Sequence, residues 1–298
     1  MAMERENKKS FESSLKSIET ENFLDRIFYR PIGYRIALLL SKTPITPNVV
    51  TIISIFVGVF AGILLYYQNI YINLIGFALL VVANILDCVD GQLARLTGIK
   101  SAAGRILDGL AGDLWFISIY ISIALRLSAD ASHSFTWIIV SLAGVSNLIQ
   151  ANVADFYKTA HLYFISPQKG AEFDTVAGVK AKHAAMSKGI SKFLYLLYIY
   201  YTMLQAKVTP EMQNVLTRLS EKYGKDIPED IRLKLRTLSL NMMPLFNITT
   251  FNGRSLAMLV GILFQNLWIY LFFEITVLNI VLFIAMNKYE RSCKKLEV

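Results

Sequence analysis

Two aspartates stand three residues apart at the end of a long apolar stretch, in the segment "DCVDGQLAR" (residues 87–95). No acidic or basic residue lies between Lys42 and Asp87. On a helix with about 3.6 residues per turn, Asp87 and Asp90 share one face. Two carboxylates held this close repel each other unless a cation lies between them, and oxygen ligands suit Mg²⁺ or Mn²⁺. The pair therefore predicts a metal site.

The same helix face carries residues that suit a phosphate ligand. Gly91 and Ala94 fall within about 40° of Asp87, and Arg95 lies about 80° from it. The two small residues leave room for a ligand to approach the backbone, and Arg95 offers a fork of hydrogen-bond donors to a phosphate. We interpret the face as a metal-assisted phosphate site. The alternatives are a structural ion pair between an aspartate and Arg95, or charges that reach toward water from a helix end.

A third carboxylate follows after a short connection. The segment "GRILDGLAGDLWF" (residues 104–116) opens the next apolar span, and its residues Gly104 and Asp108 lie one helical turn apart on one face. Two consecutive spans joined by a short link are antiparallel, so the adjoining ends of the two helices meet. Asp108 is therefore expected to join Asp87 and Asp90 in one aspartate cluster.

These residues together resemble the signature of the CDP-alcohol phosphatidyltransferase family, D-x2-D-G-x2-A-R-x8-G-x3-D-x3-D. The positions that match are Asp87, Asp90, Gly91, Ala94, Arg95, Gly104 and Asp108. The tripeptide "TPN" at residues 46–48 is also similar to the family's start of the first membrane helix. The resemblance covers roughly residues 25–160.

The resemblance implies an enzyme that splits the pyrophosphate of a CDP-alcohol. An acceptor hydroxyl attacks the β-phosphorus, a phosphodiester forms and CMP leaves. The implied cofactor is Mg²⁺ or Mn²⁺, with two ions expected. The implied metal ligands are Asp87, Asp90, Asp108 and Asp113. The implied nucleotide-binding residues are Gly91, Ala94, Arg95 and Gly104.

One position departs from the signature. The family's last aspartate, held to be its general base, falls on Gly112, and Asp113 follows directly. On a regular helix Asp113 lies about 140° from Asp108, where the signature would give about 40°. Three explanations stay open. A π-bulge turns Asp113 inward to act as the base, another residue supplies the base, or the protein is inactive.

The sequence says less about the identity of the donor and the acceptor than about the type of reaction. We expect CDP-diacylglycerol as the donor and a small polyol or its phosphate as the acceptor, such as inositol, inositol phosphate or glycerol phosphate. A phosphorylated acceptor needs further cations, although each candidate also has a simpler interpretation as a charge flanking a membrane span. The candidates are Arg105, Lys158, Lys182 and Arg254. The alternatives are an aminoalcohol phosphotransferase that uses CDP-choline or CDP-ethanolamine and diacylglycerol, and a non-catalytic membrane scaffold or an ion or proton transporter.

The composition predicts an integral membrane protein. Of the 298 residues 54% are hydrophobic and 17% are charged, whereas a soluble domain has about 25% charged residues. The net charge of +8 fits an anionic membrane surface better than nucleic acid, which we do not expect as a partner. The expected partners are the CDP-activated lipid, the small alcohol and the bilayer.

The apolar spans predict an all-α, polytopic fold with six transmembrane helices. With the N-terminus in the cytoplasm, only Arg126 of the 30 Lys and Arg residues would lie outside, as the positive-inside rule requires. The active site would then face the cytoplasm, in a bacterial inner membrane or an equivalent one. We expect a polar N-terminal segment (1–22), an interfacial amphipathic helix (23–42), transmembrane helices 1–4 with the catalytic core (43–158), a cytoplasmic helical insertion (159–247), and transmembrane helices 5–6 with a basic tail (248–298).

The first span also contains a GxxxG-like pattern, "GVFAG", at residues 58–62. Gly58 and Gly62 lie on one helix face and allow another helix to approach closely. The partner helix belongs either to the same bundle or to a second copy of the chain, so a homodimer stays open.

Overall fold

The computed structural model describes residues 11–99, 101–129, 134–166, 175–187, 189–224 and 226–296, and it has helices but no β-strand among them. The predicted all-α, polytopic fold class is confirmed. Within these residues five helices are long and apolar enough to cross a membrane, and the shorter apolar helix Phe251–Leu263 corresponds to the fifth predicted span. The five long helices are Pro47–Tyr66, Ile70–Thr97, Gly104–Ala129, Phe135–Ile165 and Trp268–Lys294.

The chain divides into two compact units. The first comprises Met1–Asn147 and Arg254–Ile275, and the second comprises Leu148–Gly253 and Thr276–Val298. The division cuts through α6 (Ser134–Ile165), α12 (Phe251–Leu263) and the π-helical segment η3 (Phe273–Leu278), so these elements contribute residues to both units.

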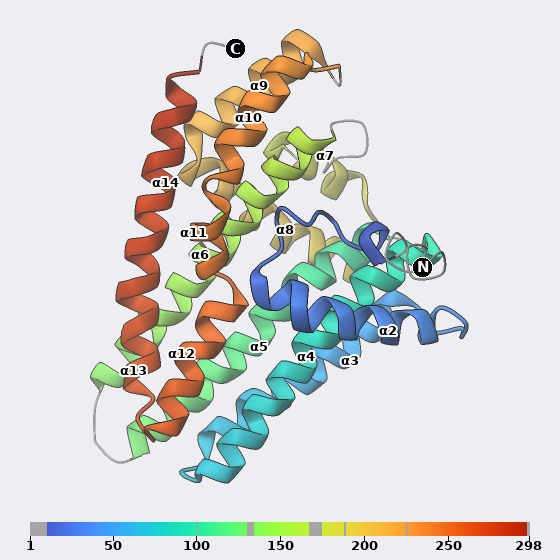
Figure 1. Cartoon of the computed structure of the whole chain (residues 1–298). Coiled ribbons are helices and arrows are strands. Elements are labelled where there is room, and N and C mark those ends of the chain that lie inside the picture. Colours follow the sequence, from blue (N-terminus) through green and yellow to red (C-terminus); the bar gives the residue numbers. More distant parts are fainter. Residues whose placement is uncertain are drawn as a thin grey trace. The chain divides into compact units, whose positions relative to one another are not determined.

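The three long helices α3, α4 and α5 form the centre of the first unit, where α3 lies beside both of the others (Figure 1). α3 packs against both α4 and α5, and α2 packs against α4. The predicted interfacial segment does form a helix, as a π-helical turn η1 that continues into α2. The elements of this region are η1 (Asp25–Tyr29), α2 (Arg30–Leu40), α3 (Pro47–Ile63), the 3₁₀ turn η2 (Leu64–Tyr66), α4 (Ile70–Thr97) and α5 (Ala102–Ala129). α13 (Trp268–Phe272) also belongs to the first unit.

Local sequence signals define the ends of α4. The side chain of Asn69 accepts hydrogen bonds from the backbone N–H groups of Tyr71 and Ile72, and so caps the first turn. Gly98 ends the helix in the left-handed conformation, with φ at 73°, which glycine adopts without strain. α5 starts only a few residues later, so the end of α4 and the start of α5 are neighbours and the helices run antiparallel (Figure 1).

The two glycines of the GxxxG-like pattern bring α3 close to α5 within the chain. A Cβ atom at Gly58 would lie 2.2 Å from Cδ1 of Trp115, and one at Gly62 would lie 2.7 Å from Oγ of Ser118. The Ser118 hydroxyl donates a hydrogen bond to the carbonyl of Val59 at 2.8 Å. Packing inside the bundle therefore accounts for the pattern, and homodimer formation stays a prediction.

We expect Gly58→Ala to lower the thermal unfolding midpoint of the purified protein in detergent. The added methyl group overlaps the ring of Trp115, which is 2% exposed, and overpacking of this kind costs about 1–3 kcal/mol. Gly144→Ala is the matched control, because its Cβ would meet Tyr120 at an ordinary 3.5 Å. Equal midpoints for the two variants would contradict close packing of α3 on α5.

In the second unit several helices pack against α14. α9, α10 and α11 pack against α14, and α7 packs against α8. Glu290 links α14 to α6 and α9, since its carboxylate accepts a hydrogen bond from the Tyr157 hydroxyl of α6 at 2.7 Å and from the backbone N–H of Glu211 of α9 at 2.7 Å. The helices are α7 (Val176–Ala185), α8 (Ile190–Val208), α9 (Pro210–Tyr223), α10 (Glu229–Leu240), α11 (Met243–Ile248) and α14 (Asn279–Lys294).

Candidate metal centre

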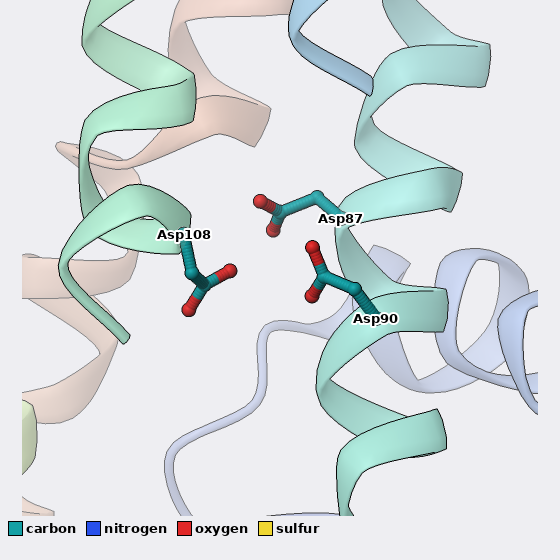
Figure 2. A group of neighbouring side chains, drawn as sticks. All are labelled: Asp87, Asp90 and Asp108. Atoms are coloured by element: carbon teal, nitrogen blue, oxygen red, sulfur yellow. The ribbon is translucent and has the colours of Figure 1, made fainter. Parts of the chain in front are cut away.

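The aspartate cluster predicted from the sequence forms in the first unit. Asp87 and Asp90 come from α4 and Asp108 from α5, and one carboxylate oxygen of each lies within 4.8 Å of the others. Figure 2 shows the three side chains pointing toward one another across the space between the two helices. It is the one group of three or more potential metal ligands found in the described part of the chain.

The chemistry of this donor set fits a hard divalent cation. All three donors are carboxylates, which Mg²⁺ and Mn²⁺ prefer over nitrogen or sulfur ligands. Asp90 is 3% exposed, while Asp87 and Asp108 are half-buried, so the cluster is partly open to its surroundings. Carboxylates held together away from water need a positive charge among them. The type of these three ligands therefore fits one or two divalent metal ions.

Apolar packing on the opposite face fixes the rotation of α4. Val89 and Leu93 are fully buried in a cluster with Ala37 of α2 and Val50 of α3. Since a helix has only one orientation that buries this face, the packing directs the aspartate face of α4 toward α5. Val89 and Leu93 lie about 200° and 240° around the helix from Asp87, so their burial leaves the aspartate face free of this packing.

The first turns of α3 contact Asp90 of the cluster and the start of α5, a contribution that sequence reasoning missed. The Thr51 hydroxyl donates a hydrogen bond to Oδ2 of Asp90 at 2.6 Å. Asn48 packs against Gly104 at the start of α5, where a Cβ would lie only 2.3 Å from its Oδ1 atom. Ser101 adds a hydroxyl that accepts the N–H of Gly104 at 2.9 Å. The absence of a side chain at Gly104 thus makes room for Asn48.

Two of the predicted phosphate-binding residues, Gly91 and Arg95, lie close together on α4. A Cβ atom on Gly91 would lie 3.3 Å from Nη2 of Arg95, so the glycine leaves space beside the guanidinium group. Arg95 uses its Nε–H to bond the backbone carbonyl of Ser14 rather than an aspartate, and its Nη2 atom is buried with no hydrogen-bond partner. Ala94 is half-buried on the same helix. An unpaired buried donor of this kind suits an anionic ligand.

The N-terminal segment is a further part of the site's surroundings that the sequence did not reveal. Ser14 is 1% exposed, and its hydroxyl accepts a hydrogen bond from Nε2 of Gln92 at 3.2 Å. The same nitrogen donates to the carbonyl of Arg30, whose side chain forms an ion pair with Glu21 at 2.9 Å. Residues 11–21 therefore pack on α4 about one turn beyond the aspartates, a contact that was not predicted for the polar N-terminal segment.

Asp113 is not part of the aspartate cluster. α5 is α-helical from Ala102 to Ala129, so the expected π-bulge between Asp108 and Asp113 is absent from this described helix. Asp113 is half-buried and lies about 140° around the regular helix from Asp108. The geometry gives no support to Asp113 as a fourth metal ligand, and its assignment as the base stays a prediction.

Among the four candidate cations for the acceptor, Arg254 has a clear structural partner. Its Nε–H donates to Oε1 of Glu274 at 3.1 Å, its Nη2 donates to the carbonyl of Asn147 at 3.3 Å, and its guanidinium lies 5.6 Å from the ring centre of Phe116. Both charged side chains are buried, so this is an ion pair inside the first unit. This ion pair was not predicted from the sequence.

The other three candidates differ in placement. Arg105 is exposed on the first turn of α5, about one turn before Asp108. Lys158 is half-buried and Lys182 is exposed, and both belong to the second unit. Their role in binding an acceptor stays a prediction.

A family model described as CDP-alcohol phosphatidyltransferase matches residues 44–216. The chain belongs to this family. The matched region contains α3, α4 and α5 with the entire aspartate cluster, and it extends beyond residue 160, where the resemblance was expected to end, through α7, α8 and part of α9. The CDP-alcohol phosphatidyltransferase match thus includes much of the segment that we predicted as an insertion.

The chain is also similar to a protein from Pyrococcus horikoshii that is named archaetidylinositol phosphate synthase. It is 38% identical to the chain over 91 residues, which is 30% of the chain and 47% of the relative. The chain thus spans about half the length of this relative.

Proposed function

We propose that the protein transfers a phosphatidyl group from a CDP-alcohol to a small alcohol and releases CMP, as a step of phospholipid biosynthesis. The observation that carries the proposal is the aspartate cluster, whose three carboxylates meet within 4.8 Å on the two helices that bear the family signature. The expected donor is CDP-diacylglycerol. The name of the Pyrococcus relative favours inositol phosphate among the predicted acceptors.

In the proposed reaction, Asp87, Asp90 and Asp108 hold divalent metal ions. When bound, these ions neutralise the pyrophosphate and stabilise the departing CMP. The oxygen of the acceptor hydroxyl forms a bond to the β-phosphorus of the donor, and the bond from that phosphorus to the bridging oxygen breaks, so that the bridging oxygen leaves with CMP. The proton of the acceptor hydroxyl passes to a base on the protein.

Other residues of α4 and α5 would bind the nucleotide and accept the proton. Gly91 leaves the surface of α4 free beside Arg95, whose unpaired Nη2 can donate to a phosphate oxygen. We assign the base to Asp113. Because a regular α5 turns this carboxylate away from the aspartate cluster, the acceptor hydroxyl would reach it from the flank of α5 or through one water molecule.

The proposed site lies at the cytoplasmic side of the membrane. The support is the distribution of Lys and Arg along the chain, which leaves only Arg126 on the outer side of a six-span topology. A position at the membrane surface suits the reaction, since the CDP-activated substrate is a lipid and the acceptor is soluble. Arg105, on the first turn of α5, is the candidate nearest in sequence to the cluster for binding a phosphorylated acceptor.

The test is Mg²⁺-dependent CMP release by the purified protein from a panel of substrates. The donors are CDP-diacylglycerol, a CDP-activated archaetidyl lipid, and CDP-choline with diacylglycerol, and the acceptors are inositol, inositol phosphate and glycerol phosphate. We expect CMP with a CDP-activated lipid and inositol phosphate. CMP release only from CDP-choline with diacylglycerol would establish the aminoalcohol alternative, and no release from any combination would overturn the enzymatic proposal.

A further inference from the structure

We infer that Thr51 is a positioning residue, which orients the Asp90 carboxylate for metal binding through a hydrogen bond from α3. The inference rests on the proposed function, because it assigns the aspartate cluster to divalent cations. Thr51 is not part of the family signature recognised in the sequence, and it is expected to act through Asp90 rather than by touching a substrate.

The contact is short, buried and specific. The Thr51 hydroxyl lies 2.6 Å from Oδ2 of Asp90, and the two residues are 2% and 3% exposed. A hydroxyl that donates to an ionised carboxylate makes a stronger bond than one between neutral groups. In the absence of competing water, this bond fixes the torsion of the Asp90 side chain.

The alternative acceptor for the same hydroxyl is weaker. Thr51 Oγ1 also lies 3.1 Å from the carbonyl of Pro47, one turn earlier in α3. That carbonyl already accepts the backbone N–H of Thr51 in a regular helix, and it carries no net charge. A hydroxyl has only one proton to donate, so the shorter, charge-assisted bond to Asp90 takes it.

The α3 backbone around Thr51 is fixed by packing against both α4 and α5. Val50 is buried in the apolar cluster with Val89 and Leu93 of α4, and Gly58 fixes the distance of α3 from α5. Thr51 is β-branched, so its χ1 angle has few accessible states within the helix. The hydroxyl is therefore presented to Asp90 by a rigid element rather than by a mobile side chain.

Thr51 bonds Oδ2 of Asp90, and Figure 2 shows that the Asp90 carboxylate is turned toward Asp87 and Asp108. Hydrogen-bond partners of metal ligands typically contribute about 10- to 100-fold to metal affinity. A free Asp90 side chain would have to lose its rotational freedom when the ion binds, and the bond from Thr51 removes part of that cost in advance.

The test measures Mn²⁺ binding to the purified protein by electron paramagnetic resonance, with no lipid substrate present. We expect Thr51→Val to raise the Kd for Mn²⁺ about 10- to 100-fold, and Thr51→Ser to restore it to within about threefold of the wild-type value, because serine keeps the hydroxyl. Ser54→Ala is the matched control. It removes a buried α3 hydroxyl that bonds only the carbonyl of Thr51, and it should leave the Kd unchanged.

A double-variant comparison separates a direct effect from a general one. In an Asp90→Asn background, Thr51→Val should weaken Mn²⁺ binding no further, since the carboxylate it orients is gone. Thr51→Ala provides the same comparison if the valine variant does not fold, as judged by its thermal midpoint.

Wild-type Mn²⁺ affinity in folded Thr51→Val, or equal losses in the valine and serine variants, would overturn the positioning role. CMP release is measured on the same preparations to keep the two proposals apart. Metal-dependent CMP release together with an unaffected Kd in Thr51→Val would overturn the role of Thr51 alone. No Mn²⁺ binding by the wild-type protein would overturn the metal assignment of the cluster as well.

Discussion

Asp108→Asn is expected to lower the rate of CMP release about 1,000-fold. The substitution keeps the size of the side chain but removes the carboxylate that α5 contributes to the aspartate cluster. Bound metal ions stabilise a transferring phosphoryl group by several kcal/mol, and a loss of about 4 kcal/mol corresponds to about 1,000-fold in rate. Because Asp87 and Asp90 both belong to α4, Asp108 is the one member of the cluster that ties the site to α5.

The measurement compares initial rates at saturating Mg²⁺ with those of Asp230→Asn, a matched change of an exposed aspartate at the start of α10. The control should retain the wild-type rate. Higher Mn²⁺ concentrations should recover part of the activity of Asp108→Asn, because the defect is weakened metal binding. A rate above one tenth of wild type at the Mg²⁺ concentration that saturates the wild type would mean that Asp108 does not hold a catalytic ion.

Asp113→Asn is expected to lower the rate of CMP release by at least about 100-fold, the usual contribution of a positioned general base. The asparagine side chain cannot accept the proton of the acceptor hydroxyl. Since Asp113 lies outside the aspartate cluster, the variant should bind Mn²⁺ with the wild-type Kd, in contrast to Asp108→Asn.

The two readouts for Asp113→Asn distinguish three roles of this aspartate. A slow enzyme with normal Mn²⁺ affinity supports Asp113 as the base. A rate near that of wild type assigns the base to another residue. A strong loss of Mn²⁺ affinity would show that α5 rearranges when the metal binds, and that Asp113 joins the cluster in that state.

The aspartate cluster could be predicted because its determinants are local. The three-residue spacing of Asp87 and Asp90 defines one face of a helix, and the short link after Gly98 brings the next helix back beside it. A periodic pattern and a short connection are sufficient to place Asp108 against the first pair without knowledge of the rest of the fold. The all-α membrane fold followed from composition and span length in the same way.

The contacts that the sequence did not predict are long-range and involve residue types with several common roles. Thr51 lies in an apolar span, where a threonine usually bonds its own helix, and its bond to Asp90 depends on how α3 is rotated against α4. Arg254 and Glu274 are 20 residues apart on different elements, and Glu274 lies in the π-helical segment η3, whose register a regular helical pattern does not give.

The N-terminal segment was missed for a different reason. Residues 11–21 contain three serines, three glutamates and one lysine, and their apolar residues Phe11, Leu15 and Ile18 form only a short helical pattern that does not identify its partner. Their docking combines apolar contacts of the buried Leu15 and of Phe11 with Tyr34 and polar pairs such as Ser14 with Gln92 and Glu21 with Arg30. Such pairs become visible only when the partner helix is in place.

Mg²⁺ dependence of CMP release tests most directly whether the aspartate cluster holds the ions that carry out the transfer. Purified protein is treated with excess EDTA, and CMP release from a CDP-activated lipid and inositol phosphate is followed while free Mg²⁺ is restored, for the wild type and for Asp90→Asn. We predict no release in EDTA, saturable recovery for the wild type and a large shift to higher Mg²⁺ for the variant. An unchanged rate in EDTA, or identical Mg²⁺ curves for the two proteins, would contradict a metal-dependent transfer at this cluster.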